Sequence, residues 1–454
     1  MKNKEQIIKE LQEENRKLKE KVKQITNEKE QIEKHKEQIE KEFEEFKAKH
    51  NSTVGELRKA MHLKPNLYAK KIGLGAKQGH KAYTRKVPGR IDNIKELILD
   101  KCPECNHELP KESSETRERY STDIEFVIKT VNTKYVIPRK YCKICKKIVE
   151  PTIHEVLPHA RFGLKLMLFV MYLRIALRLP VNKVQEFLKT ICSLNISEGE
   201  IILIGHQLAK AFGPYYKTLE RLIKLARVKH SDITSWRTES KNYSAWVFIS
   251  AGVVLYKITR RGNAKVPLKL FGNKQQGKIL VVDRGSVFRS LAESAGFILQ
   301  FCWSHILQDT KELARDFGLE GKYVHRKLKQ IFQDAKSLDH QGTEEQVLKL
   351  KERIQQLTKR HYKHKTIFRF VNNLAKRDLN GLFLFVTDKD VDPTNNISEQ
   401  KLRQLVIFRK ITNGSRSVRG AETTAVLFSI IETLKYQGKN VLEGLYETIR
   451  TSRT

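Results

Sequence analysis

Three acidic residues in the C-terminal half of the chain are candidates for a shared metal site. Asp283 directly follows four apolar residues, 279–282, of which three are β-branched. Such a run predicts a strand buried on both faces of a mixed or parallel sheet, and catalytic groups collect at the carboxyl edge of such sheets. Asp232 lies inside another predicted strand, and Glu399 follows the turn-forming residues 392–396, which predict a helix start. An acid in such a position is, taken singly, more often a surface or capping carboxylate. The prediction of a metal site therefore depends on the three side chains lying close together in the folded protein.

Carboxylates grouped in this way suit phosphodiester cleavage. Mg²⁺ or Mn²⁺ takes oxygen ligands and keeps several waters, so a few carboxylates are enough to hold it. Two such ions about 4 Å apart can activate a water and stabilise the leaving 3′-oxygen. We therefore take Asp232, Asp283 and Glu399 as candidate catalytic and magnesium-binding residues. Arg284 adjoins Asp283, where it would either contact a DNA phosphate or weaken metal binding.

Two pairs of cysteines predict a second, structural metal site. Cys102 and Cys105 form one C-x-x-C pair, and Cys142 and Cys145 form the other. A two-residue spacer turns both thiolates toward one point, so the two pairs can hold Zn²⁺ tetrahedrally with no open position. Alternating apolar residues between the pairs suit a short β-ribbon, which predicts a zinc-ribbon-like domain over 96–152. The alternative is two unrelated redox or structural pairs.

Cys302 and His305 form a C-x-x-H pair after a predicted strand. This pair could bind a metal or brace the acidic site. Because a lone pair lacks two of the ligands of a closed site, a buried cysteine at the strand end with a packed histidine is the favoured interpretation.

The elements that must position the acids follow a recognisable order. Three successive strands are followed by a short irregular or helical piece, a strand, a helix and a strand. This order resembles a ribonuclease H-like sheet, in which the first and fourth strands supply neighbouring carboxylates and a later helix supplies a third. We assign 226–438 to this catalytic domain, with a helical insertion at about 306–390. The predicted elements are strands at 227–234, 244–250, 253–259, 279–282 and 297–301, a helix at 287–294, and a closing helix at 425–434 that packs on the sheet.

Residues 160–225 are predicted to be helical. Pro180 ends one apolar helix, and Ser197 with Glu200 forms a capping box for another that runs to about Phe212. The region is either a DNA-binding helix-turn-helix or a packed bundle. The mostly apolar sequence of the helix after Ser197 favours a bundle.

The first fifty residues predict a coiled coil. They contain no Gly or Pro, and apolar residues recur at spacings of three and four over six heptads, which indicates self-association as a dimer or higher oligomer. The alternative is a single charged helix that packs on its own protein. The two seam series are Ile8, Asn15, Val22, Lys29, Lys36, Phe43 and Leu11, Leu18, Ile25, Ile32, Ile39, Phe46.

Residues 51–95 combine helix breakers with many cations. This composition predicts a basic arm that follows DNA phosphates, or a flexible basic linker, and the two are compatible. Further cations follow Glu399, and 439–454 is left as a C-terminal tail. The candidate DNA-binding residues are Lys70, Lys71, Lys77, Lys81, Arg85, Arg403, Arg409 and Lys410.

The charge of the whole chain favours a polyanionic partner. The 454 residues carry a formal net charge of +35, and the length predicts several domains. A generally basic, solvated surface is the alternative. The sequence begins with charged residues, and its longest apolar run, 166–173, is about a third of a bilayer span. We therefore expect no membrane association and a cytoplasmic, nucleoid-associated protein.

Three segments resemble the acidic blocks of the IS66-type insertion-sequence transposases, in the right order. The N-terminal coiled coil, basic arm and cysteine pairs also match that family. The segments are Ser231–Arg237 with Lys241–Phe248, Val282–Gly285 with Gln300–His305, and Asn395–Arg403 with Arg409, Lys410, Gly414 and Ser415.

The resemblance implies a DDE-type DNA transposase with a ribonuclease H-like core. Transposon ends would be hydrolysed, and the freed 3′-hydroxyl would attack target DNA without a covalent protein–DNA intermediate. Asp232 and Asp283 would be metal ligands, and Glu399 would be a ligand or orient the water. The alternatives are a nucleic-acid-binding regulator with an inactive nuclease fold, and a coiled-coil and zinc adaptor without a DNA role.

Overall fold

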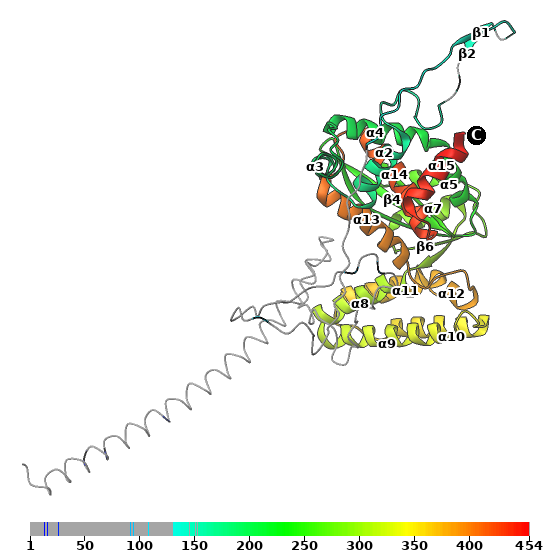
Figure 1. Ribbon diagram of the computed structural model, residues 1–454. Coiled ribbons are helices and arrows are strands. Elements are labelled where there is room, and N and C mark those ends of the chain that lie inside the picture. Colours follow the sequence, from blue (N-terminus) through cyan, green and yellow to red (C-terminus); the bar gives the residue numbers. More distant parts are fainter. Residues whose placement is uncertain are drawn as a thin grey trace, which may run out of the picture.

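The computed structural model describes residues 130–144, 146–149, 151 and 153–453, with six isolated positions before them. The predicted coiled coil and basic arm lie almost wholly outside the described residues, as do Cys102, Cys105 and Cys145. Cys142 is described, at the end of strand β1 (Lys140–Cys142), which pairs with β2 (Lys147–Val149) in an antiparallel hairpin. Figure 1 shows this hairpin projecting from the body of the protein.

A mixed five-stranded sheet forms the centre of the protein. Its strands, in spatial order, are β5-β4-β3-β6-β7, in which β5, β4 and β3 are antiparallel neighbours and β3, β6 and β7 are parallel neighbours. The predicted succession of three strands, a crossover, a strand, a helix and a strand is thus present. The strands span β3 (Val228–Thr238), β4 (Lys241–Ser250), β5 (Val253–Thr259), β6 (Ile279–Val282) and β7 (Ile298–Phe301).

Helices cover both faces of the sheet. On the face that carries Trp246 and Phe248, the contacts come from α6 (Lys265–Phe271) and α7 (Ser286–Ala295), through edge-on packing of Phe271 and Phe288. On the opposite face, α13 (Asn396–Thr412) and α14 (Val418–Tyr436) pack together through Phe408 and Phe428. Trp236 and Trp246 are buried, as expected for core residues.

Both outer strands of the sheet are covered. The hydroxyl of Ser429 on α14 accepts a hydrogen bond from Tyr256 N–H (2.8 Å), and the Tyr216 hydroxyl donates to Tyr256 C=O (2.7 Å). Thr433 both accepts from Val254 N–H (3.0 Å) and donates to Val254 C=O (2.9 Å). At the other edge, the 3₁₀ helix η3 (Leu379–Gly381) packs against β7. The predicted packing of the closing helix on the sheet is confirmed.

Replacing Thr433 with valine is expected to destabilise the fold by about 1–3 kcal/mol. The substitution keeps the shape of the side chain but leaves the N–H and C=O of Val254 without partners in a buried place. Urea unfolding measures this loss. Thr451→Val is the matched control, because the Thr451 side chain is exposed and its hydroxyl donates to the C=O groups of Glu447 and Thr448 in its own helix. Equal losses in the two variants would contradict the prediction.

The helices before the sheet form a packed group. The apolar helix α2 (Leu164–Met171) continues into a π-helix, and α4 (Glu198–Ala211) packs against both α2 and α14. The predicted capping box is present, since the Ser197 side chain accepts from Glu200 N–H and the Glu200 side chain accepts from Ser197 N–H. The buried side chains of α4 favour a bundle over a groove-reading helix. The other members are η1 (Tyr172–Ala176), α3 (Val181–Cys192) and α5 (Gly213–Leu225).

Helices α8 to α12 lie together at one end of the protein (Figure 1). This helical segment leaves the sheet after β7 and returns to the same place, because Trp303 N–H donates to Pro393 C=O (3.0 Å). Thr343 and Gln346 form the predicted capping box of α10. The helices are α8 (Trp303–Asp316), α9 (Gly318–Ser337), α10 (Glu344–Gln356), α11 (Lys365–Lys376) and α12 (Leu384–Thr387).

The residues assigned to a C-terminal tail form a helix instead. Helix α15 (Val441–Arg453) packs against α14 and α2, and Leu445 and Ile449 are buried. The cause is an apolar stripe at a spacing of four residues, Val441, Leu445 and Ile449. No helix in the described ranges is long and apolar enough to cross a membrane.

Candidate active site

The parallel pairing of β3 with β6 brings two of the three predicted acids together. The register aligns Val228 with Ile279 and His230 with Val281. Continuing it by two residues sets Asp232 beside Asp283, and aligned residues of parallel strands point to the same face. The two carboxylates interact electrostatically, because the charge of Asp283 raises the pKa of Asp232.

Each aspartate has one oxygen held by a backbone amide. Asp232 Oδ1 accepts from Ile233 N–H (2.7 Å), and Asp283 Oδ1 accepts from Gly285 N–H (3.0 Å). A Cβ atom at Gly285 would lie 2.9 Å from Asp283 Oδ1, so only glycine permits this close approach without a shift. Within the described ranges, the second oxygen of each carboxylate has no hydrogen-bond donor. Those two oxygens are available to a cation.

Buried Asn395 fixes the start of the helix that carries Glu399. Its side-chain amide donates to Ser231 C=O (2.8 Å), one residue before Asp232, and its backbone N–H donates to the Cys302 sulfur (3.1 Å). Glu399 N–H in turn donates to Asn395 C=O (3.3 Å). Asn395 precedes α13 as its N-cap, but its side chain binds strand β3 and does not cap the helix. The third acid is thereby held against the strand that carries the first.

Cys302, His305 and Glu399 form a cluster next to the aspartates. One ligand atom from each lies within 4.8 Å of the others, and His305 Nδ1 is 3.5 Å from Glu399 Oε1. Cys302 is fully buried, as expected for a packed cysteine. The cluster offers sulfur, nitrogen and oxygen ligands, whereas the aspartates offer only oxygen ligands, and an all-oxygen set suits Mg²⁺ better. Because His305 Nδ1 lies near Glu399 Oε1, His305 can orient the Glu399 carboxylate.

The environment shifts the pKa of two residues in the site. Burial raises the pKa of Asp232 to about 6, and the charges of Asp283 and Glu399 add to this rise. The pKa of His305 is raised to about 9 by the adjacent Cys302 side chain and by the charges of Glu399 and Asp283, although burial opposes the rise. Carboxylates crowded in this way repel one another until a cation joins them.

The pKa of Asp232 predicts a pH-dependent stability in metal-free protein. Because the pKa rises from 3.8 to about 6 on folding, ionised Asp232 destabilises the fold. The cost is fully present above about pH 6 and disappears as the pH falls toward 3.8. Asp232→Asn should therefore raise the free energy of unfolding at neutral pH by at most about 3 kcal/mol, and by progressively less below pH 6. Urea unfolding with a chelator measures this difference, and a gain that does not change with pH would contradict the prediction.

Arg284 is turned away from the acids. Its guanidinium forms ion pairs with Asp309 and with Asp378 (3.6 Å) and lies 4.7 Å from the ring centroid of Phe370. Asp378 is fully buried and also pairs with Arg289 of α7 (3.0 Å). Arg284 therefore links the strand-end loop to the inserted helices. The two roles considered for it, contacting a DNA phosphate or weakening the metal site, stay predictions.

A family model, Transposase IS66 family, matches residues 159–423 of this chain. The chain belongs to this family. The matched range holds the sheet, all three acids, and the cluster of Cys302, His305 and Glu399. Membership gives the chain the general activity of a DNA-cleaving and DNA-joining enzyme, with DNA as its substrate. No match is found among curated proteins.

The predicted DNA-binding residues of this family member are only partly described. Arg403 and Lys410 are exposed on α13, whereas Arg409 donates to the backbone and hydroxyl oxygens of Ser235 on β3. Lys70, Lys71, Lys77, Lys81 and Arg85 lie outside the described residues.

Sequence reasoning missed three residues that position the site. The sequence places Asn395 only in a turn before a predicted helix, and it predicts no role for Asp378 or Arg289. Asn395 lies in one of the segments that resemble the family, which was the available signal. Asp378 gives no such signal, because nothing in its local sequence shows that two distant arginines surround it.

Proposed function

We propose that this protein is a DDE-type transposase that cuts the ends of an insertion sequence and joins them to target DNA. The sheet would be ribonuclease H-like, with Asp232, Asp283 and Glu399 as its catalytic acids. The observation that carries the proposal is the alignment of Asp232 with Asp283 on one face, each with one oxygen open, beside a helix that carries Glu399.

The donor set fits Mg²⁺ or Mn²⁺. Both aspartates offer carboxylate oxygens at the end of neighbouring strands, which are the ligands that these hard cations prefer. When bound, the ions would supply an activated water and stabilise the leaving 3′-oxygen. Glu399 would act as a further ligand or orient the water, held in place by Asn395 and His305.

The remaining assignments are proposals of the same kind. We propose a coiled coil at 1–50 that forms a homodimer or higher oligomer, a basic DNA-following arm at 51–95, and a zinc-binding domain at 96–152. Cys142 would share Zn²⁺ with Cys102, Cys105 and Cys145. The rest of the chain would comprise a helical domain at 160–225 and the catalytic domain at 226–438 with its insertion. We propose that the protein acts in the cytoplasm, at the nucleoid.

Removal of divalent metal tests the proposed activity. Full-length protein should cleave duplex DNA that carries the element's own ends only when Mg²⁺ or Mn²⁺ is present. Leaving out Mg²⁺ and Mn²⁺ should stop cleavage, and adding Mg²⁺ should restore it, because the acids cannot activate a water without the cation. DNA binding, measured in parallel, should persist without these ions.

Two outcomes would contradict this function. Cleavage that continues without these ions would exclude a metal-dependent mechanism. Binding to the element's ends without cleavage at any Mg²⁺ or Mn²⁺ concentration would favour the regulator with an inactive nuclease fold.

A further inference from the structure

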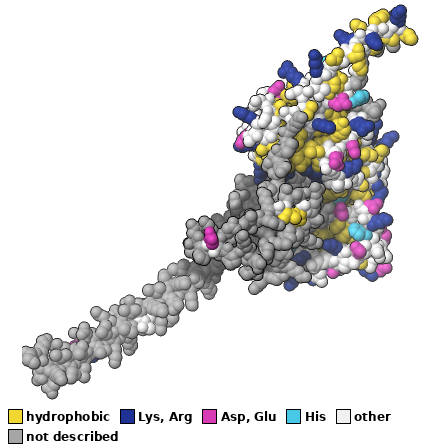
Figure 2. Space-filling view, in the orientation of Figure 1, with side chains coloured by type: hydrophobic (Ala, Val, Ile, Leu, Met, Phe, Trp, Pro, Cys, Tyr) yellow, Lys and Arg dark blue, Asp and Glu magenta, His cyan; other side chains and the backbone are white. Residues whose placement is uncertain are grey.

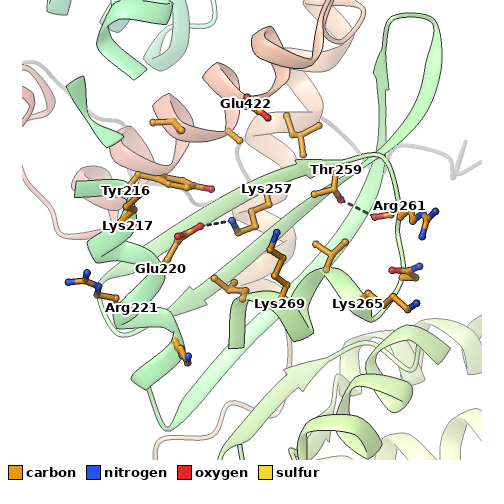
Figure 3. Close-up of a pocket in the computed structure, with 17 residues that line it drawn as sticks. Tyr216, Lys217, Glu220, Arg221, Lys257, Thr259, Arg261, Lys265, Lys269 and Glu422 are labelled. Atoms are coloured by element: carbon orange, nitrogen blue, oxygen red, sulfur yellow. Dashed lines mark hydrogen bonds and ion pairs between the residues drawn. The ribbon is translucent and has the colours of Figure 1, made fainter. Parts of the chain in front are cut away.

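A cavity of about 900 Å³ opens at the β5 edge of the sheet. Helices α5 and α6, strand β5 and the first half of α14 line it. Figure 3 shows the lining side chains, with Lys257 and Lys269 pointing into the hollow from opposite sides. None of the three proposed catalytic acids lines this cavity.

The lining is strongly basic. Seven cationic side chains line the cavity against two carboxylates, Glu220 and Glu422. Glu220 pairs with Lys257 (2.5 Å), and within the described ranges none of the other six cations has a carboxylate within 4.0 Å. We call this surface the basic cavity, and its seven cations are Lys217, Arg221, Lys224, Lys257, Arg261, Lys265 and Lys269.

Five of the cations form rows on two helices. Lys217, Arg221 and Lys224 follow one another at spacings of four and three on α5, so they share one face of that helix. Lys265 and Lys269 do the same on α6. At 1.5 Å per residue the row on α5 is about 10 Å long. Each strand of duplex DNA carries one phosphate per 3.4 Å of helix axis, so a row of this length is long enough to contact more than one phosphate.

The exposure of these cations indicates what they bind. All six cations without a carboxylate partner are exposed. A site for a small anion would bury its polar groups around the ligand, as ligand pockets generally do. Exposed, unpaired cations in rows instead suit a polyanion that stays largely hydrated and releases its counterions on binding.

The basic cavity is near the acids but not continuous with them. On neighbouring strands, Lys257 of β5 pairs with Trp246 of β4, and Trp246 pairs with Ile233 of β3, the residue after Asp232. Two strand spacings, about 10 Å, therefore separate the backbones of Lys257 and Asp232. Because neighbouring residues of a strand point to opposite faces, Lys257 and Asp232 lie on opposite sides of the sheet. On the face that Figure 2 views, cations are scattered among acidic and apolar side chains.

We propose that the basic cavity binds the phosphate backbone of duplex DNA at a second place, around the sheet edge from the acids. The contact is to the backbone and is independent of base sequence, because lysine and arginine rows read charge and spacing. The biological purpose of this contact rests on the proposed transposase function, but binding itself can be measured without cleavage.

The test compares two triple variants of the full-length chain. Arg221→Gln, Lys265→Gln and Lys269→Gln together remove three cavity cations from both helices. Lys165→Gln, Lys189→Gln and Lys439→Gln are the control, because these lysines are also exposed, lie outside the cavity and give the same change of charge. The probe is a mixed-sequence duplex several helical turns long, and the affinity is measured over a range of salt concentrations.

The cavity variant should bind about tenfold more weakly or worse at physiological salt. The slope of log K against log salt should shrink by about 2 to 3, at ~0.9 for each lost phosphate contact. The control variant should keep the wild-type slope. Equal slopes for the two variants would overturn the inference.

A further variant separates this inference from the proposed function. Asp283→Asn is expected to bind duplex normally while failing to cleave it. The cavity substitutions should weaken binding in this background as well. Weaker binding caused by the cavity substitutions in Asp283→Asn supports the inference even if no variant cleaves DNA. Unchanged binding in that background contradicts the inference even if the wild-type protein cleaves DNA.

Discussion

Replacing Asp283 with asparagine should abolish cleavage and strand transfer while leaving the fold and DNA binding intact. The open oxygen of Asp283 lies beside Asp232, and an amide in its place removes one negative ligand from the proposed metal site. A bound metal contributes several kcal/mol of transition-state stabilisation, so cleavage should fall by about 10³-fold or more. The measurement is single-turnover cleavage of duplex carrying the element's ends, with DNA affinity determined on the same preparation.

Two further variants make this result specific. Asp392→Asn makes the same chemical change at an exposed acid next to His230 and should retain most activity. Asp283→Cys should be inactive with Mg²⁺ and regain part of its activity with Mn²⁺, because a thiolate is a poor ligand for the harder ion. Wild-type rates in Asp283→Asn would remove this residue from the proposed mechanism.

The second large effect is expected at Asp378. This carboxylate is fully buried and compensates the guanidinium groups of Arg284 and Arg289, which are themselves mostly buried. Asp378→Asn removes the charge partner of Arg289, whereas Arg284 keeps its ion pair with Asp309, and breaking a buried ion pair from one side destabilises proteins by about 3–5 kcal/mol. Urea unfolding should show this loss. Cleavage should also fall, because Arg284 directly follows Asp283.

A matched change at the surface shows whether burial is the cause. Asp390 pairs with Arg227 at 2.6 Å, but both side chains are about half exposed. Asp390→Asn should therefore cost about 1 kcal/mol or less. If both variants lose the same stability, the buried cluster contributes no more than an ordinary surface pair.

The convergence of the acids could be predicted because strand order sets it. An apolar run that ends in an acid, after three strands that carry an earlier acid, aligns both once β3 and β6 pair in parallel. The capping boxes at Ser197 and Thr343 could also be predicted, because each depends on two residues three positions apart in the sequence.

The length of the hairpin between β3 and β4 was not predictable in the same way. The first strand was predicted to end at Thr234, whereas β3 continues to Thr238 and turns through Glu239 and Ser240. Both turn residues have positive φ (51° and 59°), a conformation that usually selects Asn or Gly. Glu-Ser gives no such signal. The turn is instead supported by a distant segment, because Ser415 N–H donates to Arg237 C=O (2.8 Å) and Glu239 N–H donates to Ser415 C=O (3.2 Å).

The parts of the site that escaped prediction depend on residues far apart in the chain. Asn395 bonds to Ser231 across 164 positions and to Cys302 across 93. Two of the three arginines that pair with Asp378, Arg284 and Arg289, come from a loop and a helix about ninety residues earlier. Local periodicity predicts which face of an element is apolar, but it does not say which polar groups will meet when the elements pack.

The covered outer strands of the sheet affect how copies of this protein can assemble. In the described part of the chain, Tyr216, Ser429 and Thr433 occupy backbone groups of β5, and η3 shields β7. A sheet with open edges can pair with the edge of another molecule and aggregate. That danger grows when several copies gather on one DNA molecule at high local concentration. Because both outer strands of the five-stranded sheet are covered in the described residues, crowded copies are not expected to pair through β5 or β7.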